Sequence, residues 1–246
     1  MRTLKLTVAY DGTNYVGWQR QLNGPSIQQA VEEAFLPLAG GARPPVVAGA
    51  GRTDAGVHAM AQVASVNVEF ALATDAIRRA LNVRLPYDIR VLSVEDAPLG
   101  FHARFQAKGK TYRYRIVTTE VMSPFDRLYA WHAPERRDVD AMQRATEFFA
   151  GRHDFASFHS GEGLMNGTVR VLDSVRCAVV PGGLVIDVVG DGFLRHMVRT
   201  IVGTLMDVGA GQRAPGSIPD IIARRDRRAA GPTVPACGLT LVSVRY

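Results

Sequence analysis

The order of predicted strands and helices constrains the fold of this chain more than any other feature of the sequence. Residues 3–10 alternate polar with apolar side chains, which is the period of a half-buried strand. Ser26 and Gln29 form a capping box, and apolar residues then recur on one helical face until Gly40-Gly41. These patterns predict strands over residues 3–10, 45–48, 65–70 and 89–94 and helices over residues 27–38 and 74–83. The N-terminal part of the chain is therefore expected to run β-α-β-β-α-β.

The second half of the chain repeats this element order, although its sequence does not repeat that of the first half. The predicted elements are strands over residues 110–118, 169–180, 184–189 and 239–246 and helices over residues 139–149 and 193–208. We therefore predict an α+β fold of two ferredoxin-like (RRM-like) β-α-β-β-α-β halves, whose antiparallel sheets meet at a central catalytic cleft. The N-terminal domain would span residues 1–100 and the C-terminal domain residues 105–246.

A glycine-rich loop is expected after the strand at residues 45–48. Residues 48–59 read Ala-Gly-Ala-Gly-Arg-Thr-Asp-Ala-Gly-Val-His-Ala, and glycines let a backbone turn tightly and let another molecule approach closely. Asp54 is the first candidate for chemistry because these glycines would expose and aim its carboxylate. Arg52 stands two residues earlier, so in an extended loop its guanidinium would hold Asp54 ionised. The alternative is that Asp54 only caps a turn.

The composition allows a full hydrophobic core that needs no disulfide bonds or bound metals, because the chain has 246 residues and is 47% hydrophobic. Cys177 and Cys237 are the only cysteines, and neither has a CxxC partner. This favours a reducing compartment and two buried structural thiols over a disulfide framework or a zinc site. The sequence contains neither a signal peptide nor a stretch of membrane-spanning length, so we expect a cytoplasmic protein with no membrane association.

The charge of the chain favours a polyanionic partner. The formal net charge is +6 and the sequence pI is near 9.7. Lysine occurs only at positions 5, 108 and 110, so arginine supplies nearly all of the positive charge, and its fork suits phosphates and bases. A GC-rich coding bias is the alternative reason for the many arginines.

Three further side chains could serve a site, each with a structural alternative. Tyr112 and Tyr114 share one face of the strand at residues 110–118, where both could be core residues, and for Tyr114 we prefer that interpretation. Arg195 and Arg199 would stack at positions i and i+4 on the polar face of a helix, which is ordinarily solvated.

The sequence argues against metal and nucleotide chemistry. Its histidines at positions 58, 102 and 196 share no metal-ligand spacing. The patterns HExxH, GxGxxG and the phosphate-binding loop do not occur. We therefore expect neither a metal nor a nucleotide cofactor.

Residues 51–59, Gly-Arg-Thr-Asp-Ala-Gly-Val-His-Ala, resemble the signature of the tRNA pseudouridine synthase A family. That family isomerises uridines 38, 39 and 40 in the anticodon arm of tRNA. The resemblance extends over the whole chain and includes Tyr10-Asp11-Gly12, Gly17-Trp18-Gln19-Arg20, Asn82, Leu85-Pro86, residues 101–105, residues 110–114, Trp131-His132, Asp154-Phe155, Ser157-Phe158, Thr168-Val169-Arg170, residues 197–203 and Gly238-Leu239.

The resemblance implies a role for each candidate residue. Asp54 would be the catalytic residue, Tyr112 the tyrosine that contacts the substrate, and Arg199 the active-site arginine. Apart from the resemblance, the place of Arg52 on the same loop as Asp54 suggests that it would bind the RNA there and fill the space that a flipped-out nucleotide leaves. Arg195 stands where many relatives carry Tyr or His, so it receives no role beyond a phosphate contact. The resemblance also implies a homodimer that binds the anticodon arm and needs no cofactor.

The reaction explains why so few residue types suffice. It breaks the bond between C1′ and N1, turns the uracil and rejoins it through C5, without redox change or consumption of water. One ionised carboxylate can act as nucleophile or base while an aromatic ring retains the loose base. The target nucleotide must be flipped into a closed pocket, since water would hydrolyse the reactive sugar.

Two other functions remain open on the residues alone. A non-catalytic RNA-binding protein with two RRM-like halves would explain the charge and the element order, because such sheets stack bases of single-stranded RNA. A carboxylate-dependent hydrolase would explain Asp54, yet no second acid or Ser-His arrangement accompanies it. Whether Asp54 attacks the sugar, attacks the base or removes a sugar proton also stays open.

Overall fold

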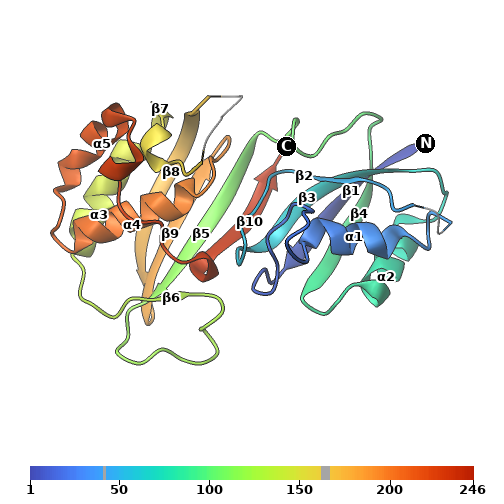
Figure 1. Ribbon diagram of the computed structural model, residues 1–246, viewed down its shortest axis with the longest axis horizontal. Helices are drawn as coiled ribbons and strands as arrows, with labels where there is room; N and C mark the ends of the chain where they lie inside the picture. The colour runs from blue at the N-terminus through green and yellow to red at the C-terminus, as the bar shows by residue number, and fades with distance from the viewer. Residues whose placement is uncertain (41–42, 162–166) are drawn as a thin grey trace. The chain divides into compact units, whose positions relative to one another are not determined.

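The computed structural model describes residues 1–40, 43–161 and 167–246 (Figure 1). The chain divides into two compact units, which we call unit 1 (Met1–Lys108 and Leu241–Tyr246) and unit 2 (Gly109–Thr240). Both units combine strands with helices, so the predicted α+β class is confirmed. The predicted domains, residues 1–100 and 105–246, differ from this division because the last six residues group with unit 1.

Unit 1 has the element order predicted for it. Its elements are β1 (Arg2–Tyr10), α1 (Ile27–Phe35), β2 (Val47–Gly49), β3 (His58–Val68), α2 (Thr74–Arg84), β4 (Ile89–Ala97) and the end of β10 (Leu239–Arg245). β1 pairs antiparallel with both β3 and β4, and β2 pairs antiparallel with β3. The spatial order is therefore β4-β1-β3-β2, with β10 also beside β3.

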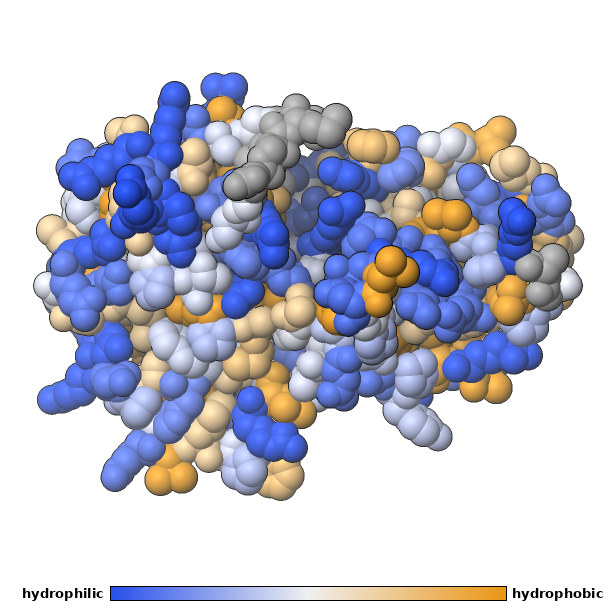
Figure 2. Space-filling view, viewed as in Figure 1, coloured by the Kyte–Doolittle hydropathy of each residue, from blue (hydrophilic) through white to orange (hydrophobic). Residues whose placement is uncertain are grey.

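The alternation in β1 decides which of its faces is buried. Leu4, Leu6 and Val8 are fully buried, and β1 is the central strand between β3 and β4. Val31 and Phe35 of α1 are also fully buried, and this helix crosses in front of the strands in Figure 1 with α2 near it. Hydrophilic side chains dominate the face drawn in Figure 2, where hydrophobic ones form separate groups. Apolar burial thus stabilises unit 1 from within.

Most strands of unit 2 pair antiparallel. Its strands and helices are β5 (Gly109–Val117), β6 (Trp131–His132), α3 (Val139–Thr146), β7 (Gly151–Asp154), β8 (Val169–Val180), β9 (Gly183–Gly190), α4 (Met197–Gly209) and α5 (Ile218–Arg224). The strand order is β5-β9-β8-β7, and β6 adds to β5 in parallel. Cys177 on β8 is buried, Cys237 is half-buried, and both thiols are free. Burial raises the pKa of Cys177 to about 11, so its thiol stays protonated.

Two predicted helices have different ends in the structure. α4 begins at Met197 and not at residue 193, because His196 takes a left-handed conformation with φ of 63°. Arg195 therefore precedes the helix, and the prediction that Arg195 and Arg199 stack on one helical face is wrong. α1 ends at Phe35, since Pro37 has no N–H to extend it, and not at Gly40-Gly41, where the stop was predicted. Of these two glycines, Gly41 lies outside the described residues.

The elements β6, β7 and α5 were not predicted. β6 has two residues, β7 has four and α5 has seven, so none is long enough to show a clear hydrophobic period. Among the residues that the structure describes, no helix is both long and apolar enough to cross a membrane.

α4 packs backbone to backbone against Gly231 and Pro232. A Cβ atom on Gly203 would lie 1.9 Å from the carbonyl oxygen of Pro232, and one on Gly231 would lie 2.6 Å from the Thr204 nitrogen. Gly231 N also donates to Thr204 Oγ1 at 2.9 Å. This contact fixes the helix that carries Arg199 to the segment that follows α5.

We expect Gly203→Ala to lower the free energy of unfolding by about 3 kcal/mol, because the new methyl group must displace a backbone carbonyl. Gly216→Ala is the matched control, since a Cβ there meets nothing within 4 Å, and it should change stability by less than about 0.5 kcal/mol. Urea unfolding of the two variants measures both values. Equal stability of the two would contradict the close packing of α4.

Candidate active site

Asp54 lies on the connection between β2 and β3 in unit 1. The two strands pair from Val47↔Val66 to Gly49↔Ala64, and Ala50 N donates to Val63 O at 2.7 Å. Residues 51–57, which we call the Asp54 loop, therefore close a hairpin. Val57 N donates to Asp54 O at 3.1 Å, and Gly56 has a φ of 75°, which favours glycine. Asp54 is half-buried as a residue, on a backbone that these hydrogen bonds fix.

The backbone of residues 12–18 packs directly against the Asp54 loop. Trp18 N donates to Thr53 O at 3.1 Å, and Gly56 N donates to Tyr15 O at 3.3 Å. A Cβ atom on Gly17 would lie 2.4 Å from Thr53 O and 3.0 Å from the carbonyl carbon of Asp54, and Gly17 has a φ of 104°. This segment can therefore approach the loop only with glycine at position 17.

Gly12 makes a second contact of the same kind. A Cβ there would lie 2.0 Å from Val57 O. The segment thus contacts both ends of the loop without side chains between the two backbones, which leaves the Asp54 backbone little room to move.

Buried polar side chains of β1 and β3 form hydrogen bonds with the Asp54 loop. The Tyr10 hydroxyl shares a hydrogen bond of 2.9 Å with Thr53 Oγ1, and Gln62 Nε2 donates to Gly51 O at 2.9 Å. Tyr10 and Gln62 are 4% and 0% exposed. Burial raises the pKa of Tyr10 to about 12, although hydrogen bonds with Thr53 and Gln62 oppose part of this rise. β1 and β3 therefore each contribute one neutral side chain that fixes the loop.

His58 has a structural position at the start of β3. Its Nδ1 lies 3.1 Å from Gly12 N, which donates to it, and 3.1 Å from Asp11 Oδ1. The imidazole is 4% exposed, so it ties the segment before Gly17 to β3. In the described parts of the chain, no three His, Cys, Asp or Glu side chains group as a metal site would require.

Arg52 is exposed on the same loop and is held by one side chain of residues 12–20. Its Nε donates to Gln19 Oε1 at 3.2 Å. Gln19 was not predicted to contact Arg52, because the two are 33 positions apart and no local pattern links them. The pairing of Arg52 with Asp54 stays a prediction.

Tyr112 and Arg199 belong to unit 2. Tyr112 on β5 pairs with Val188 and is 6% exposed, and its ring meets Phe193 edge-on at 5.1 Å between centroids. Arg199 is half-buried on α4, and its Nε donates to Val234 O at 2.7 Å. Asp54 and Arg52 lie in unit 1.

Tyr114 is a core residue, as we preferred from the sequence. It is 0% exposed, and its hydroxyl donates to Pro235 O at 2.7 Å. Burial raises the pKa of this hydroxyl above its usual range. Tyr114 and Arg199 therefore both fix residues 234–235, one from the sheet and the other from α4.

Known proteins match the chain along its length. A family model described as tRNA pseudouridine synthase matches residues 6–106 and 145–246. The tRNA pseudouridine synthase A of Pelobacter propionicus is 47% identical over 246 residues, which is 100% of both chains. The proteins of that name from Geotalea uraniireducens and Acetivibrio thermocellus are 44% and 42% identical, again over 100% of both chains.

These matches place the protein among the isomerases, the class in which pseudouridine synthases fall. The chain belongs to the tRNA pseudouridine synthase family, as the resemblance in its sequence predicts.

Proposed function

We propose that this chain isomerises uridine to pseudouridine at positions 38, 39 and 40 of the tRNA anticodon arm, with Asp54 as catalytic nucleophile or base. The observation that supports this most is the setting of Asp54. The residue is half-buried on a loop whose backbone is fixed by Gly12, Gly17 and the buried Tyr10. Such preorganisation suits a group that must act on a flipped nucleotide without moving itself.

Arg52, Tyr112 and Arg199 are the proposed substrate-binding residues. An arginine on the Asp54 loop can bind phosphate and occupy the space left by the flipped base. The ring of Tyr112 can retain the loose uracil, and the guanidinium of Arg199 can stabilise negative charge that develops during the transfer. The reaction needs neither oxidant nor metal, so we propose no cofactor.

The proposed architecture is two ferredoxin-like halves with a catalytic cleft between them. Support comes from the order β4-β1-β3-β2 in unit 1. In this order β3 lies between the two strands of the β1-α1-β2 crossover, and β1 lies between the two strands of the β3-α2-β4 crossover. Each of these middle strands is antiparallel to its neighbours. In unit 2, β5, β9 and β8 would correspond to the first, third and second strands of the same arrangement. The cytoplasm, where tRNA is processed, is the proposed location.

Asp54→Asn should abolish turnover by several orders of magnitude, because an amide is neither nucleophile nor base. Affinity for tRNA should persist, since most of it would come from contacts with phosphates. Single-turnover tritium release from tRNA labelled at uracil C5 measures the first, and filter binding on the same preparation measures the second. Asp75→Asn is the control, because Asp75 is an exposed carboxylate paired with Arg78 on α2.

Three outcomes of this test would contradict the proposal. If Asp54→Asn keeps a tenth of wild-type turnover, Asp54 is not the catalytic group. If the wild-type protein binds tRNA but releases no tritium, the chain is an RNA-binding protein without this activity. If it releases free uracil or cuts the RNA chain, the hydrolase interpretation holds.

We also propose that the active protein is a homodimer. The family resemblance supports this, and an anticodon arm longer than the cleft of one subunit gives a physical reason for tRNA to span two. One chain has a mass of 26.7 kDa, and static light scattering at micromolar concentration should give twice that mass. A monomer both with and without tRNA would exclude the dimer.

A further inference from the structure

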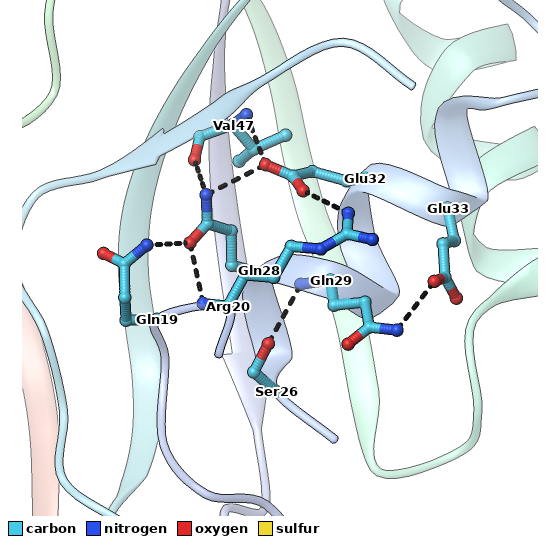
Figure 3. A network of polar contacts seen from close by, with 8 residues as sticks. All are labelled: Gln19, Arg20, Ser26, Gln28, Gln29, Glu32, Glu33 and Val47. Atoms are coloured by element: carbon cyan, nitrogen blue, oxygen red, sulfur yellow. Dashed lines mark hydrogen bonds and ion pairs between the residues drawn. The ribbon is translucent and has the colours of Figure 1, made fainter. Parts of the chain in front are cut away.

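A buried carboxylate lies at the base of a polar network in unit 1 (Figure 3). Glu32 on α1 is 5% exposed. Its Oε1 accepts from Val47 N at 3.0 Å and from Gln28 Nε2 at 2.9 Å, and its Oε2 lies 3.1 Å from Arg20 Nη1. A buried carboxylate is an acceptor only, so it dictates that each neighbouring group must donate.

Gln28, one helical turn before Glu32, has only one possible orientation of its amide. Its Nε2 donates to Glu32 Oε1 and to Val47 O at 3.1 Å, and neither oxygen can donate in return. Its Oε1 accepts from Arg20 N at 3.0 Å, and a backbone N–H can only donate. A flipped amide would oppose like atoms at both ends, so the Oε1 of Gln28 must face Gln19.

The orientation of Gln28 in turn fixes that of Gln19. Gln19 Nε2 donates to Gln28 Oε1 at 2.7 Å, which turns Gln19 Oε1 toward Arg52. That oxygen accepts from Arg52 Nε at 3.2 Å. The sequence of donors and acceptors therefore runs without a break from the buried carboxylate of Glu32, through two glutamines, to the exposed guanidinium on the Asp54 loop.

A guanidinium that is held through Nε has a fixed plane. Its Nη1 and Nη2 edge then has the geometry that binds two phosphate oxygens together. An exposed arginine otherwise loses side-chain freedom when it binds, and holding it beforehand reduces that loss. Fixing Arg52 from the protein side would therefore strengthen its contact with RNA.

We propose that Gln28 is a positioning residue for Arg52, that it acts through Gln19, and that the phosphate backbone of tRNA is the ligand that benefits. The inference rests on the proposed function only in taking Arg52 as a residue that contacts RNA. Gln28 itself is 8% exposed and touches Arg52 only through Gln19.

The next residue of the same helix is a matched control. Gln29 carries the same side chain, and its Nε2 donates to Glu33 Oε1 at 2.8 Å in an exposed pair (Figure 3). The side chain of Gln29 thus turns to Glu33, whereas that of Gln28 reaches the Asp54 loop through Gln19. Methionine has nearly the volume of glutamine and suits helices, so Gln28→Met and Gln29→Met remove hydrogen bonds with little change of shape.

The experiment is a double-mutant cycle on tRNA binding. Gln28→Met, Gln19→Met and Gln29→Met are each made in the wild-type and in the Arg52→Ala background, and affinity for an unmodified tRNA transcript is measured by filter binding. Gln28→Met and Gln19→Met should weaken binding about three- to tenfold and raise KM by a similar factor, while kcat changes less than about twofold. Gln29→Met should bind as wild type.

In the Arg52→Ala background, Gln28→Met and Gln19→Met should have no further effect, because the residue that they position is gone. Losses that simply add to that of Arg52→Ala would overturn the proposal, since a purely structural role predicts addition. Gln19 is only partly buried, so Gln19→Met carries the test if Gln28→Met does not fold.

Two readouts separate this inference from the proposed function. Arg52→Ala with wild-type affinity would overturn the positioning role, yet tritium release by the wild-type protein would still support the isomerase. If the wild-type protein released no tritium, the proposed isomerase activity would be excluded. The double-mutant cycle on tRNA binding would still test the positioning role of Gln28.

Discussion

The contact between two backbones, residues 12–18 and residues 53–57, is the constraint on which the Asp54 loop depends. Gly12 and Gly17 come so close to this loop that neither could carry a side chain. The hydrogen bonds from Trp18 N to Thr53 O and from Gly56 N to Tyr15 O close the same interface. A contact between main chains has no rotamers to vary, so it fixes the backbone of Asp54 more tightly than side-chain packing would.

The buried polar groups extend this constraint to the surroundings of the loop. Tyr10 and Gln62 hold the loop from the sheet, and Glu32 and Gln28 orient Gln19 from α1. Each of these hydrogen bonds is buried or half-buried, where an unmade bond is costly, so the groups favour one arrangement. The proposed mechanism would use this rigidity, because a flipped nucleotide would have to meet groups that are already in place.

Local patterns predicted the frame of unit 1 but not the contacts that hold its loop. The alternating pattern predicted the strand in which Leu4, Leu6 and Val8 are buried, and the glycines predicted the loop around Asp54. The link from Tyr10 to Thr53 spans 43 positions, and no period of strand or helix contains it. Gln28 and Glu32 read as polar residues beside an apolar stripe, and only tertiary packing buries them. The left-handed His196 likewise depends on its surroundings, so the true start of α4 could not be predicted.

The turnover of Gly17→Ala tests most directly whether main-chain packing sets the geometry of Asp54. The new Cβ would lie 2.4 Å from Thr53 O and must displace the loop that carries Asp54 and Arg52, whereas Arg199 lies in unit 2 and keeps its place. We predict that single-turnover tritium release at saturating enzyme falls by roughly a hundredfold while unfolding stays cooperative, and that tRNA affinity falls by at most about tenfold, through the displacement of Arg52. Wild-type turnover in a folded Gly17→Ala protein would contradict this account.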